Sequence, residues 1–114
     1  MQVPTEAVLA RVFLGEADRT PAGQPLYEAV VLKAREMGLA GATVLRGPMG
    51  FGHSQRLHTA KILDLSANLP LVIEIVDAED KIRAFLSELE GIGNIGLVTL
   101  ERVEVVRYGP GGDD

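Results

Sequence analysis

Cysteine and tryptophan are absent from this chain, and aromatic residues of every kind make up only 4% of it. Without cysteine, the chain can form no disulfide and offers no thiolate to a metal or a substrate, which fits a cytoplasmic protein. The scarcity of aromatic rings argues against a surface on which successive bases of a single-stranded nucleic acid could stack.

Positive charge and long apolar runs are also scarce. Lysine and arginine together number 11 against 16 acidic residues, a net charge of −5, so we do not expect nucleic acid as a partner. No apolar run is long enough to cross a bilayer, and residues 1–5 lack the pattern of a secretory signal, so we do not expect membrane insertion. The hydrophobic content, 46% of 114 residues, suits one domain with its own core.

Four strands are predicted from the alternating and β-branched segments, over residues 8–14, 41–45, 71–76 and 97–106. A helix is predicted to begin at Pro25 and to end before Gly38, with one apolar face formed by Leu26, Ala29, Val30, Ala34 and Met37.

A second helix is predicted after Asp77, which we expect to be its N-cap, with Glu79 and Asp80 in the first turn. This explanation is preferred to a cation site for the three acidic residues. The buried face of this helix is expected to hold Ile82, Phe85, Leu86 and Leu89, and Gly91 and Gly93 are expected to end it.

The order strand, helix, strand, strand, helix, strand predicts an α+β, ferredoxin-like βαββαβ domain over residues 8–108. Its antiparallel four-stranded sheet has two helices on one face. Another small α+β sandwich is the alternative, and residues 1–7 and 109–114 are expected to be flexible ends. The second sheet face lacks a cover, and residues 71–76 are apolar on both faces except at Glu74, so we expect an oligomer.

The connection between the second and third predicted strands is glycine-rich and cationic. Residues 46–61 contain Arg46, Arg56 and Lys61 and no acid. A connection of this length favours a binding loop. Its Gly50-Phe51-Gly52 segment could form a backbone nest for an anion, or only a tight turn that needs positive φ.

Three further side chains have a functional and a structural interpretation. Arg46 could hold a phosphate or carboxylate, or pair with an acid across a subunit interface. His58 could bind a ligand by a hydrogen bond or serve the structure. Glu74 could be an exposed edge residue, or a partnered acceptor for an amino group or for Arg46 or Arg102 of a neighbour.

No nucleophile with a matching base and no paired carboxylates are evident, so we expect neither an enzyme nor a resident cofactor. Two histidines without a nearby acid or cysteine, His53 and His58, are a poor metal site.

Several sequence words occur in the order found in the nitrogen-regulatory PII signalling proteins. They are GLAGATV at 38–44, GFG at 50–52, HT at 58–59 and LPLVIEIV at 69–76. The chain more closely resembles an uncharacterised PII-like family, domain of unknown function family 190, over residues 11–108. The words of that family are LGE at 14–16, GQPLYE at 23–28, RGPMGFG at 46–52 and LS at 65–66.

The resemblance implies a homotrimer with ligand clefts between subunits, where PII proteins bind adenine nucleotides, and a loop that reports the ligand to a partner protein. By match of words, the nucleotide-contacting positions would be Thr43, Gly50, Phe51, Gly52 and Glu74. Arg107 resembles a phosphate-binding arginine, and His58 falls in the His-Thr word.

The chain departs from PII proteins in its charges. Residues 47–66 contain no tyrosine for uridylylation, the turn at 91–96 has no lysine or arginine, and Val105 replaces a second phosphate-binding arginine. Arginine and lysine hold polyphosphates, so a smaller or less charged nucleotide is easier to accommodate than ATP.

The first hypothesis is therefore a regulatory trimer that senses a small anionic ligand, with an adenine nucleotide as the model and loop 47–66 as the contact to a partner protein. The alternatives are a metal-responsive trimer like the copper-tolerance CutA proteins, which would use His53 and His58, and a structural trimer that docks on a partner without a ligand.

Overall fold

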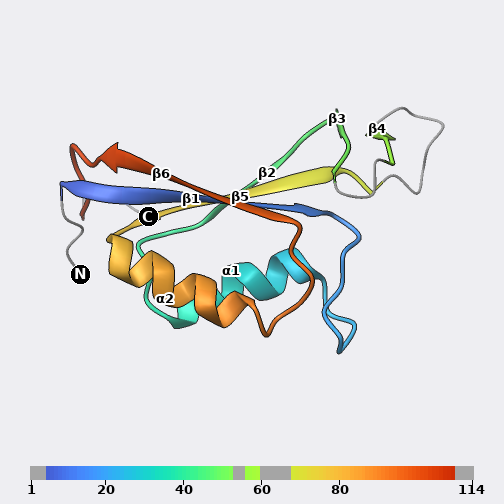
Figure 1. Cartoon of the computed structure of the whole chain (residues 1–114), viewed down its shortest axis with the longest axis horizontal. Helices are drawn as coiled ribbons and strands as arrows, with labels where there is room; N and C mark the ends of the chain where they lie inside the picture. The colour runs from blue at the N-terminus through green and yellow to red at the C-terminus, as the bar shows by residue number, and fades with distance from the viewer. Residues whose placement is uncertain (1–4, 53–55, 60–67, 110–114) are drawn as a thin grey trace.

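A computed structural model describes residues 5–52, 56–59 and 68–109 of the chain. Two helices lie under one face of a twisted sheet, and a small two-stranded ladder projects beyond one end of it (Figure 1). The sheet strands are β1 (Glu6–Gly15), β2 (Thr43–Arg46), β5 (Pro70–Asp77) and β6 (Leu97–Glu104), and the helices are α1 (Leu26–Glu36) and α2 (Glu79–Leu89). The ladder comprises β3 (Met49–Gly50) and β4 (His58–Thr59).

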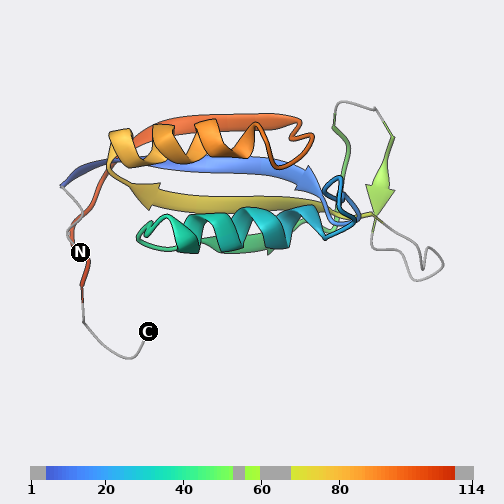
Figure 2. The ribbon, with the colours of Figure 1, turned by 90° about the horizontal axis from the view of Figure 1, so that it is seen from below.

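The strand order in the sheet is β2-β5-β1-β6, and all three pairings are antiparallel. Each half of the chain contributes a strand, a helix and a second strand, so the ferredoxin-like prediction is confirmed. In Figure 2, α1 runs along the side of β5 and β2, and α2 along the side of β1 and β6. Neither helix of the described chain has the length and apolar character of a membrane span.

The core lies between the helices and the sheet face that they cover. Because successive residues of a strand point to opposite faces, alternate residues of β1 and β5 are buried there. From the helices, Leu26, Val30 and Ala34 of α1 meet Ile82, Phe85 and Leu89 of α2, as the helical spacing predicts. The buried strand residues are Val8, Ala10, Val12, Leu14, Leu71, Ile73 and Ile75.

Helix boundaries agree with the prediction at α1 and differ at α2. Gly38 follows α1 with φ +74, the left-handed conformation that glycine adopts without strain. The predicted N-cap of α2 is wrong: Ala78 is the N-cap, and no side chain caps the helix.

Asp77 instead ends β5 as a fully buried residue. Its carboxylate accepts hydrogen bonds from the backbone N–H groups of Ala78, at 2.7 Å, and Ala40, at 2.9 Å. It therefore joins the sheet to the segment between α1 and β2. Tyr108 donates its hydroxyl to the carbonyl of Ala40 at 3.0 Å, so the C-terminal segment is fastened to the same place.

Strand lengths differ slightly from the prediction. β1 begins at Glu6, inside the segment expected to be a flexible end, and β6 ends at Glu104 rather than at 106. The backbone N–H of Val105 donates to the carbonyl of Thr5, which holds the two described ends of the chain together. Residues 1–4 and 110–114, the rest of the predicted flexible ends, lie outside the described residues.

The uncovered face of the sheet is apolar around a charged centre. The half-buried residues Leu9, Phe13, Val72 and Val76 point to it, together with the register partners of two of them, Leu45 and Leu97. At its centre, the Arg11 guanidinium contacts the carboxylates of Glu74, at 3.0 Å, and Glu101, at 2.9 Å. These hydrogen bonds, the one to Glu74 first, raise the pKa of Arg11.

Candidate functional site

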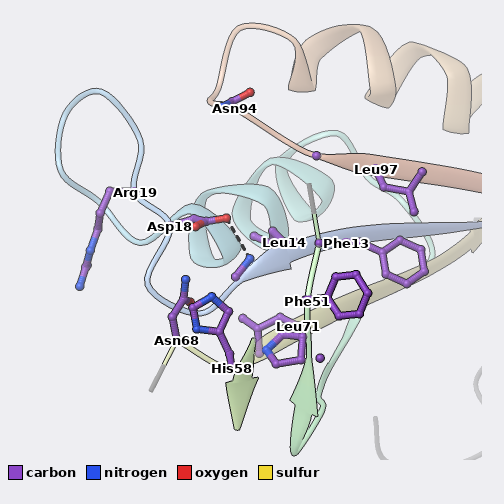
Figure 3. Close-up of a pocket in the computed structure, with 15 residues that line it drawn as sticks. Phe13, Leu14, Asp18, Arg19, Phe51, His58, Asn68, Leu71, Asn94 and Leu97 are labelled. Atoms are coloured by element: carbon purple, nitrogen blue, oxygen red, sulfur yellow. Dashed lines mark hydrogen bonds between the residues drawn. The ribbon is translucent and has the colours of Figure 1, made fainter. Parts of the chain in front are cut away.

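A pocket with a volume of about 780 Å³ lies at the end of the sheet where β1 finishes and β5 and β6 begin. The β3–β4 ladder forms one wall, and the segments after β1 and before β6 form the others (Figure 3). The lining residues come from four separate parts of the chain: Phe13–Gly15 with Asp18 and Arg19, Gly50–Gly52 with His58, Asn68 with Pro70 and Leu71, and Asn94 with Gly96 and Leu97.

Two aromatic rings contribute to the apolar side of the pocket. Phe51 follows β3 and is 63% exposed, and Phe13 belongs to β1. Figure 3 draws the two rings on the same side of the pocket, with Leu71 and Leu97 also on its walls. An exposed phenylalanine that faces a cavity is a surface on which a flat ring can stack.

Asp18 and Asn68 organise the polar side around the turn that follows β1. The Asp18 carboxylate accepts the backbone N–H of Gly15 at 2.8 Å (Figure 3), and the Asn68 side-chain oxygen accepts the N–H of Ala17 at 2.6 Å. A Cβ at Gly15 would lie 2.7 Å from that Asn68 oxygen. Only glycine therefore allows Asn68 to keep this position beside the pocket.

Two glycines of the loop, Gly47 and Gly50, pack against Pro70, which begins β5 and lines the pocket. Gly47 donates its N–H to the carbonyl of Pro70 at 2.8 Å, and a Cβ at either Gly47 or Gly50 would lie 3.1 Å from the proline ring. Neither Gly50 nor Gly52 has positive φ, so the left-handed turn that the sequence allowed for this segment is not formed. Gly50 instead pairs with His58 in the β3–β4 ladder.

Four of the eight predicted site residues line the pocket: Gly50, Phe51, Gly52 and His58. The other four do not line it. Thr43 and Glu74 are register partners on the uncovered face of the sheet, and Arg107 follows the end of β6 that is far from the pocket. Arg46 ends β2 and forms an ion pair with Glu16.

The sequence offered partners for Glu74 and Arg46 in a neighbouring subunit, but in this structure each pairs with a residue of its own subunit. Glu74 is partnered by Arg11, whereas Arg102 contacts Glu79 on α2 at 3.0 Å and Arg46 contacts Glu16. The interpretation of Glu74 as a partnered carboxylate thus agrees with the structure, but with a different arginine from those that the sequence suggested.

Sequence analysis missed Phe13, Asp18, Arg19, Asn68 and Asn94 as pocket residues. The Leu-Gly-Glu motif at residues 14–16 could have indicated this part of the pocket, because it places Gly15 and the turn after it at the end of a strand. Nothing in the local sequence indicated Asn68 or Asn94, whose position depends on the folded chain. Among the described residues, no group of three or more side chains could hold a metal ion, and His53 lies outside the described residues.

Comparison with known proteins places this geometry in a family context. The model of DUF190 (Uncharacterized ACR, COG1993) matches residues 7–105. Two UPF0166 proteins of Aquifex aeolicus are 44% and 40% identical over 98 residues, 86% of this chain and 91% and 95% of theirs. A UPF0166 protein of Methanocaldococcus jannaschii is 33% identical over 103 residues, 90% of this chain and 94% of its own.

A crystal structure from Thermus thermophilus, of a protein proposed to be a PII-like signalling protein, has a similar fold. The TM-score is 0.63 over 93% of this chain and 94% of that chain, at 14% sequence identity. This likeness supports the ferredoxin-like fold. The match over residues 7–105 and the sequence identities show that the chain belongs to the DUF190 family.

Proposed function

We propose that this protein is a PII-like sensor that binds a small anionic ligand with a flat ring, for which an adenine nucleotide is the model. The ligand occupies the pocket beside Phe51, in a trimer whose clefts lie between subunits, and loop 47–66 carries the signal to a partner protein. In this proposal the protein senses a molecule and does not transform it.

The observation that carries the proposal is the composition of the pocket walls. A volume of about 780 Å³ is within the range of ligand sites, roughly 300–1,000 Å³. Phenylalanines 13 and 51 offer faces to a ring, and the amides of Asn68 and Asn94 offer donors and acceptors to its edge. An apolar wall with a few convergent polar groups is the usual form of a small-molecule site.

The charges of the pocket favour a ligand with few phosphates. Among the described lining residues, Arg19 adds a positive charge and Asp18 a negative one. Arg46, near the pocket, is paired with Glu16. A polyphosphate needs several cationic partners, so a nucleoside monophosphate suits this set better than ATP.

The uncovered sheet face supports the trimer. Its apolar residues, with Leu45 48% and Leu97 53% exposed, would remain in water in a single chain. Arg11, Glu74 and Glu101 at its centre compensate one another in part, so the face can be covered without leaving an isolated buried charge.

The position of the loop supports its role as the reporter. Gly50 of β3, Phe51 and Gly52 after it and His58 of β4 line the pocket, and the β3–β4 ladder projects beyond the sheet (Figure 1). Met49, Phe51 and Leu57 are each more than half exposed. A ligand on Phe51 therefore contacts the same segment that presents apolar side chains to a partner.

Isothermal titration calorimetry of the full chain with adenosine, AMP, ADP, ATP and cyclic AMP tests the proposal. We expect saturable binding, with AMP at least as tight as ATP. Absence of binding across the series at millimolar ligand would contradict it and would leave a trimer that docks without a ligand.

A further inference from the structure

The ion pair between Glu16 and Arg46 stands at the edge of the pocket. Glu16 directly follows Gly15, which lines the pocket, and Arg46 is the register partner of Leu71, which also lines it. We propose that, without ligand, the Glu16 carboxylate occupies the position on Arg46 that a ligand's acidic group would take. A bound anion then replaces Glu16 as the partner of the Arg46 guanidinium. This inference rests on the proposed function and identifies Glu16 as the residue that sets its charge selectivity.

The backbone on each side of the pair is fixed to the start of β5. The N–H of Glu16 donates to the carbonyl of Leu69 at 2.8 Å, and the N–H of Gly47, next to Arg46, donates to the carbonyl of Pro70 at 2.8 Å. Since both backbones are anchored to neighbouring residues, the pair can exchange partners by side-chain rotation alone. The long arginine side chain is the part that moves.

The exposure of the pair makes such an exchange easy. The Arg46 side chain is 61% exposed and that of Glu16 28%. An ion pair this open to water stabilises a protein little, because water and salt screen it. A phosphate offers arginine two parallel hydrogen bonds and more negative charge than one carboxylate. Phosphate therefore competes well for the guanidinium.

Arg11 of the same chain is less available to a ligand anion than Arg46. Its guanidinium contacts two carboxylates at once, Glu74 and Glu101, on the uncovered sheet face and away from the pocket. Arg46 contacts the carboxylate of Glu16 and lies next to the pocket wall. It is thus the better placed of the two to accept a ligand anion.

The exchange has a consequence for the loop. Arg46 is the last residue of β2, and the loop begins at the next residue, Gly47. When Arg46 turns from Glu16 to a ligand, the change takes place at the root of the segment that would contact a partner. Charge on the ligand, rather than its ring, would then be the signal that reaches the loop.

The test compares an anionic and a neutral ligand in variants of the full chain. By calorimetry, E16Q should bind AMP about twofold to fivefold more tightly than wild type, the factor expected for removal of one exposed ion pair. R46Q should bind AMP at least about tenfold more weakly. Neither variant should change the affinity for adenosine, because adenosine has no acidic group.

E36Q is the matched control. It removes the same charge from another exposed ion pair, that of Glu36 with Lys33 on α1, and Glu36 does not line the pocket. Its AMP affinity should equal that of wild type. The inference is overturned if E16Q binds AMP as wild type does, or if E16Q changes AMP and adenosine affinity equally.

A measurement with inorganic phosphate separates the failure of this inference from failure of the proposed function. Phosphate should shift the NMR signals of the Arg46 Nε–H and the Glu16 amide in wild type, and R46Q should lose the Glu16 response. If no nucleotide binds but phosphate shifts both signals, the proposed function is contradicted and the exchange of Arg46 between Glu16 and an anion is supported. If nucleotides bind but phosphate shifts neither signal, only the exchange is contradicted.

Discussion

Replacement of Phe51 by alanine separates ligand binding from folding. The ring is 63% exposed, so its removal leaves no cavity in the core, and the free energy of unfolding should change by less than about 0.5 kcal/mol. If the ring stacks on a base, its loss costs about 1–3 kcal/mol of binding free energy. The affinity for AMP should therefore fall by about 5- to 150-fold.

Met49 provides the matched control for this experiment. It belongs to β3 in the same ladder and is 58% exposed, but it does not line the pocket. M49A should therefore keep the wild-type affinity while removing a comparable exposed apolar side chain. Calorimetry measures the affinities, and thermal unfolding without ligand measures stability.

Three results would contradict the assignment of Phe51 as the stacking surface. If F51A binds AMP as tightly as wild type, the ring of Phe51 is not the stacking surface. If F51A and M49A weaken binding by the same factor, the effect comes from the ladder as a whole. A loss of affinity in F51A together with a large fall in its melting temperature would also contradict the assignment of Phe51 to the ligand rather than the fold.

Three further predictions concern the fold and the assembly. D77N should lower the free energy of unfolding by about 2–4 kcal/mol, measured by urea titration, because its amide nitrogen would face a buried backbone N–H in place of an acceptor. V72D, on the uncovered sheet face, should convert the proposed trimer to single chains in light scattering, whereas L32D on α1 should not; a trimeric V72D would count against that face as the interface. Hydrogen bonds from two arginines, with Arg83 the larger contributor and Arg102 the second, lower the pKa of Glu79 below its ordinary value of 4.5. The Glu79 carboxylate therefore stabilises the fold above pH 4.5, and this contribution is lost as the pH falls through the lowered pKa. E79Q should therefore flatten the dependence of stability on pH below 4.5, and an unchanged curve would contradict this assignment.

The fold could be predicted because its pattern is local. Residues 8–14 and 71–76 have the alternation and β-branched content of strands, and both helices have apolar residues three and four positions apart. Asp77 was misassigned because an aspartate before a helix usually caps it. Its hydrogen bond to Ala40, 37 residues earlier in the chain, cannot be inferred from neighbours in sequence.

The candidate site was predictable in part for the same reason. Gly50, Phe51, Gly52 and His58 stand close together in the sequence, and they also lie together in the pocket. Asp18 and Asn68 reach it only because β1 and β5 pair antiparallel, with Gly15 opposite Pro70, which brings the two strand ends side by side. The polar side of the pocket could not be predicted, because the register of the two strands brings its residues together.

The partner of Arg46 also depends on the folded chain. A charged residue at a strand end has several acids within reach, and the sequence does not rank them. The structure selects Glu16 because the ends of β1 and β2 are both anchored to the start of β5. Because the structure identifies Glu16 as the partner of Arg46, the proposed exchange can be tested with E16Q and R46Q.

The proposed sensor is an assembled protein that binds an anionic, ring-containing ligand beside Phe51. Native mass spectrometry of the wild-type chain, titrated with AMP, observes assembly and ligand in one spectrum. We expect a three-chain species that gains up to one AMP per chain, and a smaller gain in F51A when AMP is held near the wild-type Kd. A spectrum of single chains, or of trimers that take up no AMP, would contradict it.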